Sequence, residues 1–470
     1  MNKKIAFSLA FLLMITRLFA GTDGITTKLK HGEDAKTVST EYKEVENLSD
    51  MFTQGKASGQ IRMFYLDRRY QGSSGASTHR DSTAIGGHLK YETATYNGVN
   101  LAAAFYTTNK IDLNQHGVQD PSLLGTGLES YSILGEAYVG YDFSQYGSQT
   151  SLKLGLQRYD TPMIGSDDAR MLPNTFEAYK LVNKDLGNTS IQVAHLNKIA
   201  YGSFSNIYSG GMLASTAGYP AAGNAGTGKY LNMGEAAAGK NTSGVTNAQV
   251  KYTSDNFHMK ASNDYAWDLY NTLYLDAGAS FQLENFKPFI QAQVIKQNNV
   301  GNAYMKDSSL GGNGDIDSLY WAAKVGAKID AFTAYIAYSQ TTDNDETDAS
   351  YKNAILSQFG GMPAFTQGMV TRHQFLAGTK ATKVAASYSF KKRGLNLSAA
   401  TYYASFDMDE NSGYGVARTA YEPGFDIKFY PAAIKNLQLR FRGNFPRKFA
   451  EGTSGNTGWD EYRLIANYNF

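Results

Sequence analysis

The chain has 470 residues, with 44 Lys and Arg against 42 Asp and Glu, a net charge of +2 and no cysteine. The near-neutral charge gives no reason to expect nucleic acid as a partner. The lack of cysteine excludes disulfides, thiolate metal sites and a cysteine nucleophile. No run of 18 apolar residues follows residue 20, which excludes a membrane-spanning helix beyond that point.

The N-terminus has the features of a secretory signal. Lys3 and Lys4 precede an apolar stretch over residues 5–15, and the small residue Ala20 precedes Gly21. We therefore predict a signal peptide over residues 1–20 and a polar lead-in over residues 21–56. The alternative, an N-terminal membrane anchor, is disfavoured by the short apolar core.

From residue 57 onward, apolar and polar side chains alternate in about eighteen segments of roughly ten residues. Such segments, repeated behind a signal peptide, are typical of transmembrane β-strands. The predicted strands cover residues 57–68, 82–92, 99–108, 132–142, 150–158, 176–184, 190–199, 245–254, 256–267, 270–283, 287–297, 319–330, 332–340, 383–390, 394–404, 422–430, 436–445 and 459–470.

The connections between these segments alternate broadly between short turns and long loops. The long ones cover residues 109–131, 159–175, 200–244, 298–318 and 341–382. Tight turns at one rim and long loops at the other are typical of outer-membrane barrels, with the turns on the periplasmic side. Residues 267–270 are the exception, because they form a short connection at a position where the alternation predicts a long loop. The number of strands around strands nine and ten is therefore left open.

The final segment gives the clearest strand pattern. Tyr462, Leu464, Ala466, Tyr468 and Phe470 share one face, and the other face is polar apart from Ile465. At ~3.3 Å per residue the apolar face extends roughly 26 Å, enough to cover most of an apolar band of ~25 Å when the strand is tilted. We predict an all-β fold, a closed antiparallel transmembrane β-barrel of about 18 strands over residues 57–470, since closure leaves no unpaired edge in lipid.

The loop over residues 159–175 breaks this pattern. It follows an alternating segment and carries three carboxylates, an arginine and two prolines, Pro162 and Pro173, which exclude regular structure. We predict that the loop folds inward and forms a pore constriction, in which Arg170 either pairs with the carboxylates or faces solute. The predicted constriction residues are Asp160, Asp167, Asp168 and Arg170.

The polar faces of the strands predict a pore wall that is mainly basic. A charged loop facing this wall would create a transverse field that selects solutes by charge and size. The sequence leaves open whether anions or cations are preferred, and any single lysine could simply be solvated. The predicted lining residues are Arg62, Lys153, Lys324, Lys428, Arg440, Arg442 and Arg463.

Several segments resemble a known family, most clearly residues 152–179, which contain the elements QRxDTP and RMxPxxF. These elements hold Gln157, Arg158, Asp160, Thr161 and Pro162, and then Arg170, Met171, Pro173 and Phe176. They resemble the OprD-type outer-membrane porins, and more closely the branch related to the campylobacter major outer-membrane protein. The resemblance runs from about residue 47 to Phe470 and is loose over residues 201–244.

The resemblance implies an eighteen-stranded porin in the outer membrane of a Gram-negative type of cell. Such porins are usually trimeric, and their third long loop folds into the pore, sometimes beside basic residues that guide carboxylate-bearing solutes. The implied function is passive diffusion of small hydrophilic, charged solutes. The implied partners are these solutes, outer-membrane lipid, the barrel-assembly machinery through Phe470, and further copies of the chain in a homotrimer.

Other functions find less support. Residues 223–230 nearly match the P-loop motif, but Tyr230 replaces the Ser or Thr that would hold Mg²⁺. The seven histidines have no ligand spacing and no GxSxG element occurs, so we predict no enzyme. The carboxylates of Asp167 and Asp168 are candidate ligands for a calcium ion. The alternative function is an adhesin or surface receptor that acts through the loops over residues 200–244 and 341–382.

Overall fold

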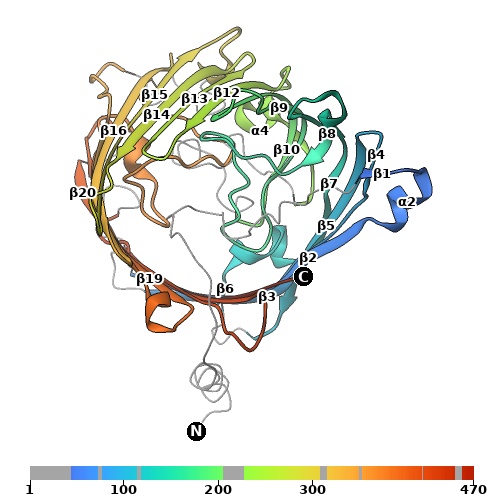
Figure 1. Cartoon of the computed structure of the whole chain (residues 1–470). Helices are drawn as coiled ribbons and strands as arrows, with labels where there is room; N and C mark the ends of the chain where they lie inside the picture. Colours follow the sequence, from blue (N-terminus) through green and yellow to red (C-terminus); the bar gives the residue numbers. More distant parts are fainter. Residues whose placement is uncertain are drawn as a thin grey trace.

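Alternation of apolar and polar side chains produces one large antiparallel sheet that curves into a barrel (Figure 1). The structure, a computed structural model, describes residues 44–71, 77–113, 118–204, 227–306, 315–348, 352–414, 417–449 and 458–470. The predicted signal peptide over residues 1–20 lies outside the described residues, as does most of the lead-in. The first barrel strand begins at Lys56, one residue before its predicted start.

Eighteen long strands form the barrel wall within the described residues, as the alternation predicted. They are β2 (Lys56–Gln71), β3 (Ser77–Glu92), β5 (Val99–Ile111), β7 (Tyr131–Asp142), β8 (Thr150–Gln157), β9 (Thr175–Asn183), β10 (Thr189–Ala200), β12 (Val245–Thr253), β13 (Phe257–Ala266), β14 (Tyr270–Ser280), β15 (Phe286–Asn299), β16 (Asp317–Ile329), β17 (Phe332–Thr341), β18 (Lys380–Ser389), β19 (Leu397–Met408), β20 (Arg418–Phe429), β21 (Leu437–Asn444) and β22 (Gly458–Asn469).

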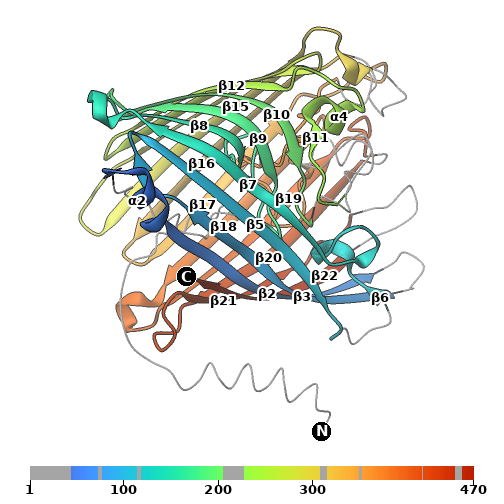
Figure 2. The same ribbon diagram turned by 90° about the vertical axis from the view of Figure 1, so that its right-hand side faces the viewer.

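The remaining elements of the described residues are short. They are the two-residue strands β1 (Glu44–Val45), β4 (Thr95–Tyr96), β6 (Val118–Gln119) and β11 (Leu231–Asn232), the helices α2 (Leu48–Thr53) and α4 (Met233–Ala238), and the 3₁₀ turns η1 (Pro121–Leu123), η2 (Thr126–Leu128), η3 (Ser144–Tyr146), η4 (Tyr304–Lys306), η6 (His373–Phe375) and η7 (Phe390–Arg393). The Asn47 side chain caps α2 by accepting a hydrogen bond from the Asp50 N–H at 2.9 Å. Figure 2 shows α2 on the outside of the barrel, at one rim. Among the described residues, no helix has the length and apolarity needed to cross a membrane.

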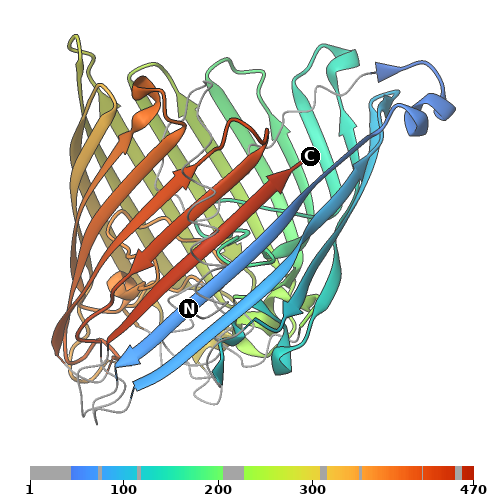
Figure 3. The same ribbon diagram turned by 90° about the horizontal axis from the view of Figure 1, so that it is seen from below.

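The first and last barrel strands close the sheet. β2 pairs antiparallel with β22 from Gln60 opposite Asn469 to Gln71 opposite Gly458. Figure 3 shows the blue first strand beside the red last strand. The Gly59 N–H also donates to the Phe470 carbonyl oxygen at 3.0 Å. The closed antiparallel topology is therefore confirmed, and it satisfies the backbone without an open edge.

The two rims differ as predicted. One rim carries tight connections such as residues 184–188, 254–256 and 330–331, and the other carries long ones such as residues 201–244, 300–316 and 342–379. β13 and β14 are joined by residues 267–269 on the long-loop rim, with Asp268 at a positive φ of 61°. The tight connection is thus a real hairpin, and strands nine and ten were counted correctly.

Side chains alternate between lipid and lumen along each strand. On β21 and β22, Phe441 and Tyr468 face outward and are exposed, whereas Arg442 and Arg463 face inward and are buried. Ile465, the apolar exception on the last strand, also points inward and is 6% exposed. It belongs to an internal apolar cluster with Phe64 and with Met171 of the loop between β8 and β9. An apolar residue on the lumen face therefore marks where a loop docks against the wall.

Candidate pore constriction

The loop over residues 158–174, between β8 and β9, folds into the barrel lumen (Figure 1). Its apolar residues Met163, Ile164, Met171 and Leu172 are each at most 3% exposed, and Pro162 and Pro173 are buried. Met171 and Leu172 pack on inward side chains of β2. Because a buried proline restricts its own φ and the residue before it, the two prolines fix the backbone where the loop enters and leaves the lumen.

Asp168 is bound to the barrel wall by an ion pair. The Arg62 guanidinium on β2 donates from Nη1 and Nη2 to the two carboxylate oxygens, at 2.6 and 3.1 Å. Arg62 Nη1 also donates to the Arg170 carbonyl oxygen at 2.5 Å. Burial alone would raise the pKa of Asp168, but the charge and hydrogen bonds of Arg62, together with the charge of Arg158, hold the pKa below its ordinary value.

Asp167 is bound to a different loop. Its carboxylate lies 3.3 Å from Nη2 of Arg372, and both side chains are nearly fully buried. Arg372 belongs to the connection between β17 and β18, which also reaches into the lumen. The same two loops meet through a backbone hydrogen bond in which the Gly165 N–H donates to the Phe359 oxygen at 2.9 Å. The candidate constriction is therefore built from two loops that are distant in sequence.

Asp160 and Arg170 occupy different environments from those two aspartates. Asp160 is exposed, and its carboxylate accepts hydrogen bonds from the Ser166 N–H at 2.7 Å and the Ser166 hydroxyl at 3.0 Å. Arg170 is 1% exposed and donates from Nη2 to Glu461 of β22 at 2.9 Å. The sequence predicted that Arg170 pairs with the loop carboxylates or faces solute; the structure corrects this, because the guanidinium is buried against the wall.

The loop over residues 341–382 was predicted as an outer loop, but residues 353–379 of the observed connection (342–379) are largely buried inside the barrel. Glu422 of β20 holds it in place, since its carboxylate accepts hydrogen bonds from the Met369 N–H at 2.7 Å and the Thr371 N–H at 2.9 Å. A Cβ on Gly368 would lie 2.3 Å from the same carboxylate, so glycine permits this close approach. Lys383 of β18 donates to the Gln367 oxygen at 2.7 Å.

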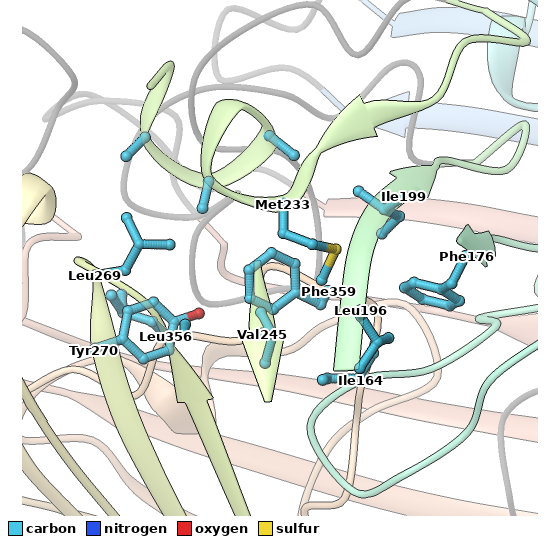
Figure 4. Close-up of a cluster of buried hydrophobic side chains, with 14 of the residues drawn as sticks. Ile164, Phe176, Leu196, Ile199, Met233, Val245, Leu269, Tyr270, Leu356 and Phe359 are labelled. Atoms are coloured by element: carbon cyan, nitrogen blue, oxygen red, sulfur yellow. The ribbon is translucent and has the colours of Figure 1, made fainter. Parts of the chain in front are cut away.

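An internal apolar cluster joins three loops near the long-loop rim (Figure 4). Ile164 comes from the loop over residues 158–174 (the first loop) and Phe359 from the connection over residues 342–379 (the second loop). Met233 comes from α4, in the connection between β10 and β12. All three side chains are at most 3% exposed. This cluster holds the loops together by packing, at about 25 cal/mol for each Å² of apolar surface buried. The described parts of the loops that an adhesin would use therefore contribute to the lumen instead.

The predicted basic residues all lie on the lumen face, although they have different partners. Arg440 donates to Asp426 at 2.8 Å, Arg442 lies 3.7 Å from the same carboxylate, and Arg463 donates to Glu461 at 2.5 Å. Lys153 lies over the Tyr138 ring at 3.9 Å and Lys324 over the Phe365 ring at 4.2 Å. Lys428 is 9% exposed on β20, beside Arg440 in the strand register.

A pocket opens between the first loop and this wall. It is lined by Gln60, Arg62, Phe64, Asp168, Ala169, Arg170, Arg440, Arg442, Ile465 and Asn467. Arg442 and Arg463 lie directly opposite each other in the β21–β22 register. Each keeps one buried guanidinium nitrogen without a hydrogen-bond partner. Two adjacent guanidinium groups concentrate positive charge, which favours an anion over a cation.

The calcium hypothesis for Asp167 and Asp168 finds no support in this geometry. Each carboxylate faces a guanidinium, which occupies the oxygen lone pairs that a calcium ion would need. No group of three or more His, Cys, Asp or Glu side chains suited to a metal occurs in the described parts of the chain.

Arg372 and Glu422 were not among the predicted site residues, because nothing in the sequence near them indicates a partner.

A closed antiparallel barrel with a lumen narrowed by inward loops defines a channel-forming porin of the outer membrane. The family model for "outer membrane porin, OprD family" matches residues 49–470, and the chain therefore belongs to the OprD family. The chain is accordingly a channel for small solutes in the outer membrane of a Gram-negative type of cell, and not an enzyme. The adhesin alternative is not supported.

Solved structures agree in fold. OccK9 (OpdG) of Pseudomonas aeruginosa superposes with a TM-score of 0.70 at 17% identity, covering 89% of this chain and 99% of that chain. OpdK of the same organism, determined with vanillate, gives 0.69 at 16% identity, with the same coverage of 89% and 99%. A BenF-like porin from Pseudomonas fluorescens Pf-5 gives 0.68 at 16% identity, again over 89% and 99%. A search of curated proteins finds no match.

Proposed function

We propose that the pore passes small hydrophilic anions, carboxylates in particular, by passive diffusion. The observation that carries this proposal is the set of arginines in the pocket between the first loop and strands β2, β21 and β22. The loop carboxylates Asp167 and Asp168 are already paired with guanidinium groups. Guanidinium groups outnumber carboxylates in the wall, since Arg440 and Arg442 share Asp426 while Arg170 and Arg463 share Glu461, and this excess gives the constriction a positive potential.

The constriction itself is part of the proposal. Asp160, Asp167 and Asp168 hold the first loop in shape, and Arg62, Arg440, Arg442, Arg463 and Lys428 supply the wall that a solute passes. Lys153 and Lys324 are lumenal lysines in other sectors of the wall and would attract anions there. The similar OpdK structure was determined with vanillate, whose carboxylate belongs to the proposed solute class.

Reversal potentials across a planar bilayer test the proposal. In a KCl gradient, a single wild-type channel should show a reversal potential of the sign expected for chloride preference. Liposome swelling should also be faster with glucuronate than with glucose, two solutes of similar size that differ in charge. Potassium preference, together with equal swelling rates, would refute the anion assignment while leaving the porin fold unchanged.

We further propose that residues 1–20 are a cleaved signal peptide, that the chain assembles as a homotrimer, and that it is close to the campylobacter-type branch of the family. The motif residues around Asp160 and Arg170 support the branch, and the trimer rests on that resemblance. Phe470, which is 49% exposed at the end of β22, is suited to recognition by the barrel-assembly machinery. Mass measurement of the purified assembly tests the trimer, and deletion of Phe470 should reduce insertion.

A further inference from the structure

The outward face of the barrel ends differently at its two rims. At the tight-turn rim, the last outward residues of the strands include exposed aromatic side chains such as Tyr91, Phe257, Phe286 and Phe332. Such aromatic residues are suited to the membrane interface. At the long-loop rim, the outward face continues beyond its aromatic residues to charged side chains. This asymmetry indicates that the two rims meet different headgroups.

The strands that close the barrel carry the first group of outward charges. Asp67 of β2 accepts from Arg69 Nε at 3.0 Å and lies 2.7 Å from His79 Nε2 on β3. The Arg69 side chain is 58% exposed, whereas that of Asp67 is 8% exposed. Asp67 follows the outward aromatic Tyr65 by two residues, which places it about 5 Å further out on a strand tilted by about 40°.

β22, which pairs with β2 where the barrel closes, carries one partner of a second ion pair. Asp460 of β22 lies directly opposite Arg69 in the β2–β22 register. It accepts from Arg447 Nη2 at 2.6 Å, and both side chains of this pair are partly exposed. Asp460 is two residues from the outward aromatic Tyr462. Two guanidinium groups, one on β2 and one in the connection between β21 and β22, therefore lie beyond the aromatic residues.

Two other sectors of the barrel repeat the arrangement. Lys198 of β10 lies 2.8 Å from Glu177 of β9, and Glu177 is two residues from the exposed Tyr179. Lys296 of β15 pairs with Asp317 of β16. These strands lie far around the wall from β2 and β22 (Figure 1). In each pair the cation is more than 40% exposed.

The position and composition of these pairs determine what they can bind. They lie beyond the apolar band, at the level of the headgroups, so the charges need not enter hydrocarbon. Exposed surface ion pairs contribute only ~0–1 kcal/mol to stability, so stability alone does not account for four of them at one rim. A guanidinium or ammonium group held at the headgroup level is a donor for phosphate oxygens.

We propose that Arg69, Arg447, Lys198 and Lys296 form a lipid belt that binds the phosphate groups of anionic lipids in the outer leaflet. The acidic partners hold the cations against the wall, directed at the headgroups, and prevent them from extending into bulk water. The belt is separate from the lumen, so it acts on the membrane around the channel and not on the solute.

Native mass spectrometry of the full-length protein tests this proposal with lipid A as the probe. Wild type should retain several lipid A molecules, and far fewer of the dephosphorylated form. A variant with Arg69→Gln, Arg447→Gln, Lys198→Gln and Lys296→Gln should bind lipid A more weakly, by roughly fivefold for each cation removed. Lys392→Gln, which removes the Lys392–Asp330 ion pair at the opposite rim, is the matched control and should bind like wild type.

Two readouts keep the test decisive if the fourfold variant assembles poorly. Lys198→Gln alone should show the single-cation loss, with conductance unchanged because the side chain faces outward. On wild type, lipid A should protect Lys198 and Lys296 from amine acylation, and dephosphorylated lipid A should not. Equal binding of both probes, or equal acylation of both lysines with either probe, would overturn the proposal.

Discussion

The Asp167 carboxylate and the Arg372 guanidinium face each other at 3.3 Å inside the barrel, although 205 residues separate them in the chain. Asp167 has a positive φ of 36°, which is uncommon outside glycine. The ion pair therefore joins two loops at a point where the backbone of one is already constrained. Removing either partner leaves a buried charge without its counterion, which typically costs ~3–5 kcal/mol.

Arg372→Ala should loosen both loops at this junction. We expect larger current noise in the open channel and a higher mean conductance, because neither loop retains its ionic contact with the other. Single-channel recording measures both quantities. Lys352→Ala is the control, since it removes a partly exposed ion pair with Asp348 in the same connection. If both variants behave like wild type, the junction does not hold the constriction.

Glu422 holds the second loop through three consecutive backbone N–H groups, those of Met369, Val370 and Thr371. Glu422→Ala would leave these buried donors unsatisfied, at ~1–3 kcal/mol for each lost partner. We expect a lower unfolding temperature and more rapid proteolysis within residues 362–372. Glu410→Ala, at an exposed residue in the connection between β19 and β20, should change neither. Wild-type resistance to protease in the Glu422 variant would contradict this role.

The register of β21 can be tested by two changes with opposite expected effects. Arg440→Glu with Arg442→Glu should shift selectivity toward cations with little loss of assembly, because both side chains face the lumen. Leu439→Arg should impair insertion, at about 2–4 kcal/mol for a lipid-facing charge near midplane. Reversal potentials and heat-dependent migration on gels measure the two effects. Swapped outcomes would mean that the register is off by one residue.

The Asp168–Arg62 ion pair predicts how the loop responds to acid. The folded-state pKa of Asp168 lies below its ordinary value of 3.8, because the charge and hydrogen bonds of Arg62 and the charge of Arg158 together outweigh the effect of burial. The pair therefore contributes its full stabilisation above about pH 4, and this is lost as the pH falls through the folded-state pKa. Conductance noise should be constant from pH 7 to about 4 and rise only as the pH falls further, through the folded-state pKa. Asp168→Asn should show the raised noise at every pH, and a wild-type rise already at pH 6 would contradict the assignment.

The fold followed from the sequence because a period of two is a local signal, repeated in every strand. Tyr462 to Phe470 show it within a single segment, and the inward loop was indicated by its carboxylates and prolines. The contacts of the loop could not be predicted in the same way. Arg372 and Glu422 lie far from residues 158–174 in the chain, and irregular loops have no period from which a partner could be inferred.

Some of the missing information was present as exceptions to the strand pattern. Phe64, Leu66 and Ile465 are apolar residues on lumen faces, and each contributes to the internal cluster where the first loop docks. The apolar stretch over residues 354–365 was an equally unusual feature for an exposed outer loop. Apolar side chains at lumen positions therefore predict loop docking, whereas the particular ion pairs required the three-dimensional arrangement. Arg170 was misassigned because its partner, Glu461, is 291 residues away.

The single-channel conductance of a loop deletion tests the central claim most directly. Removing residues 164–169 deletes Asp167, Asp168 and the contact of Ile164 with Phe359. If this loop narrows the pore, conductance should rise well above wild type and the preference for anions should change. Removal of residues 185–187, which are exposed in the tight connection between β9 and β10, should leave conductance unchanged. An unchanged conductance after the first deletion would contradict the account.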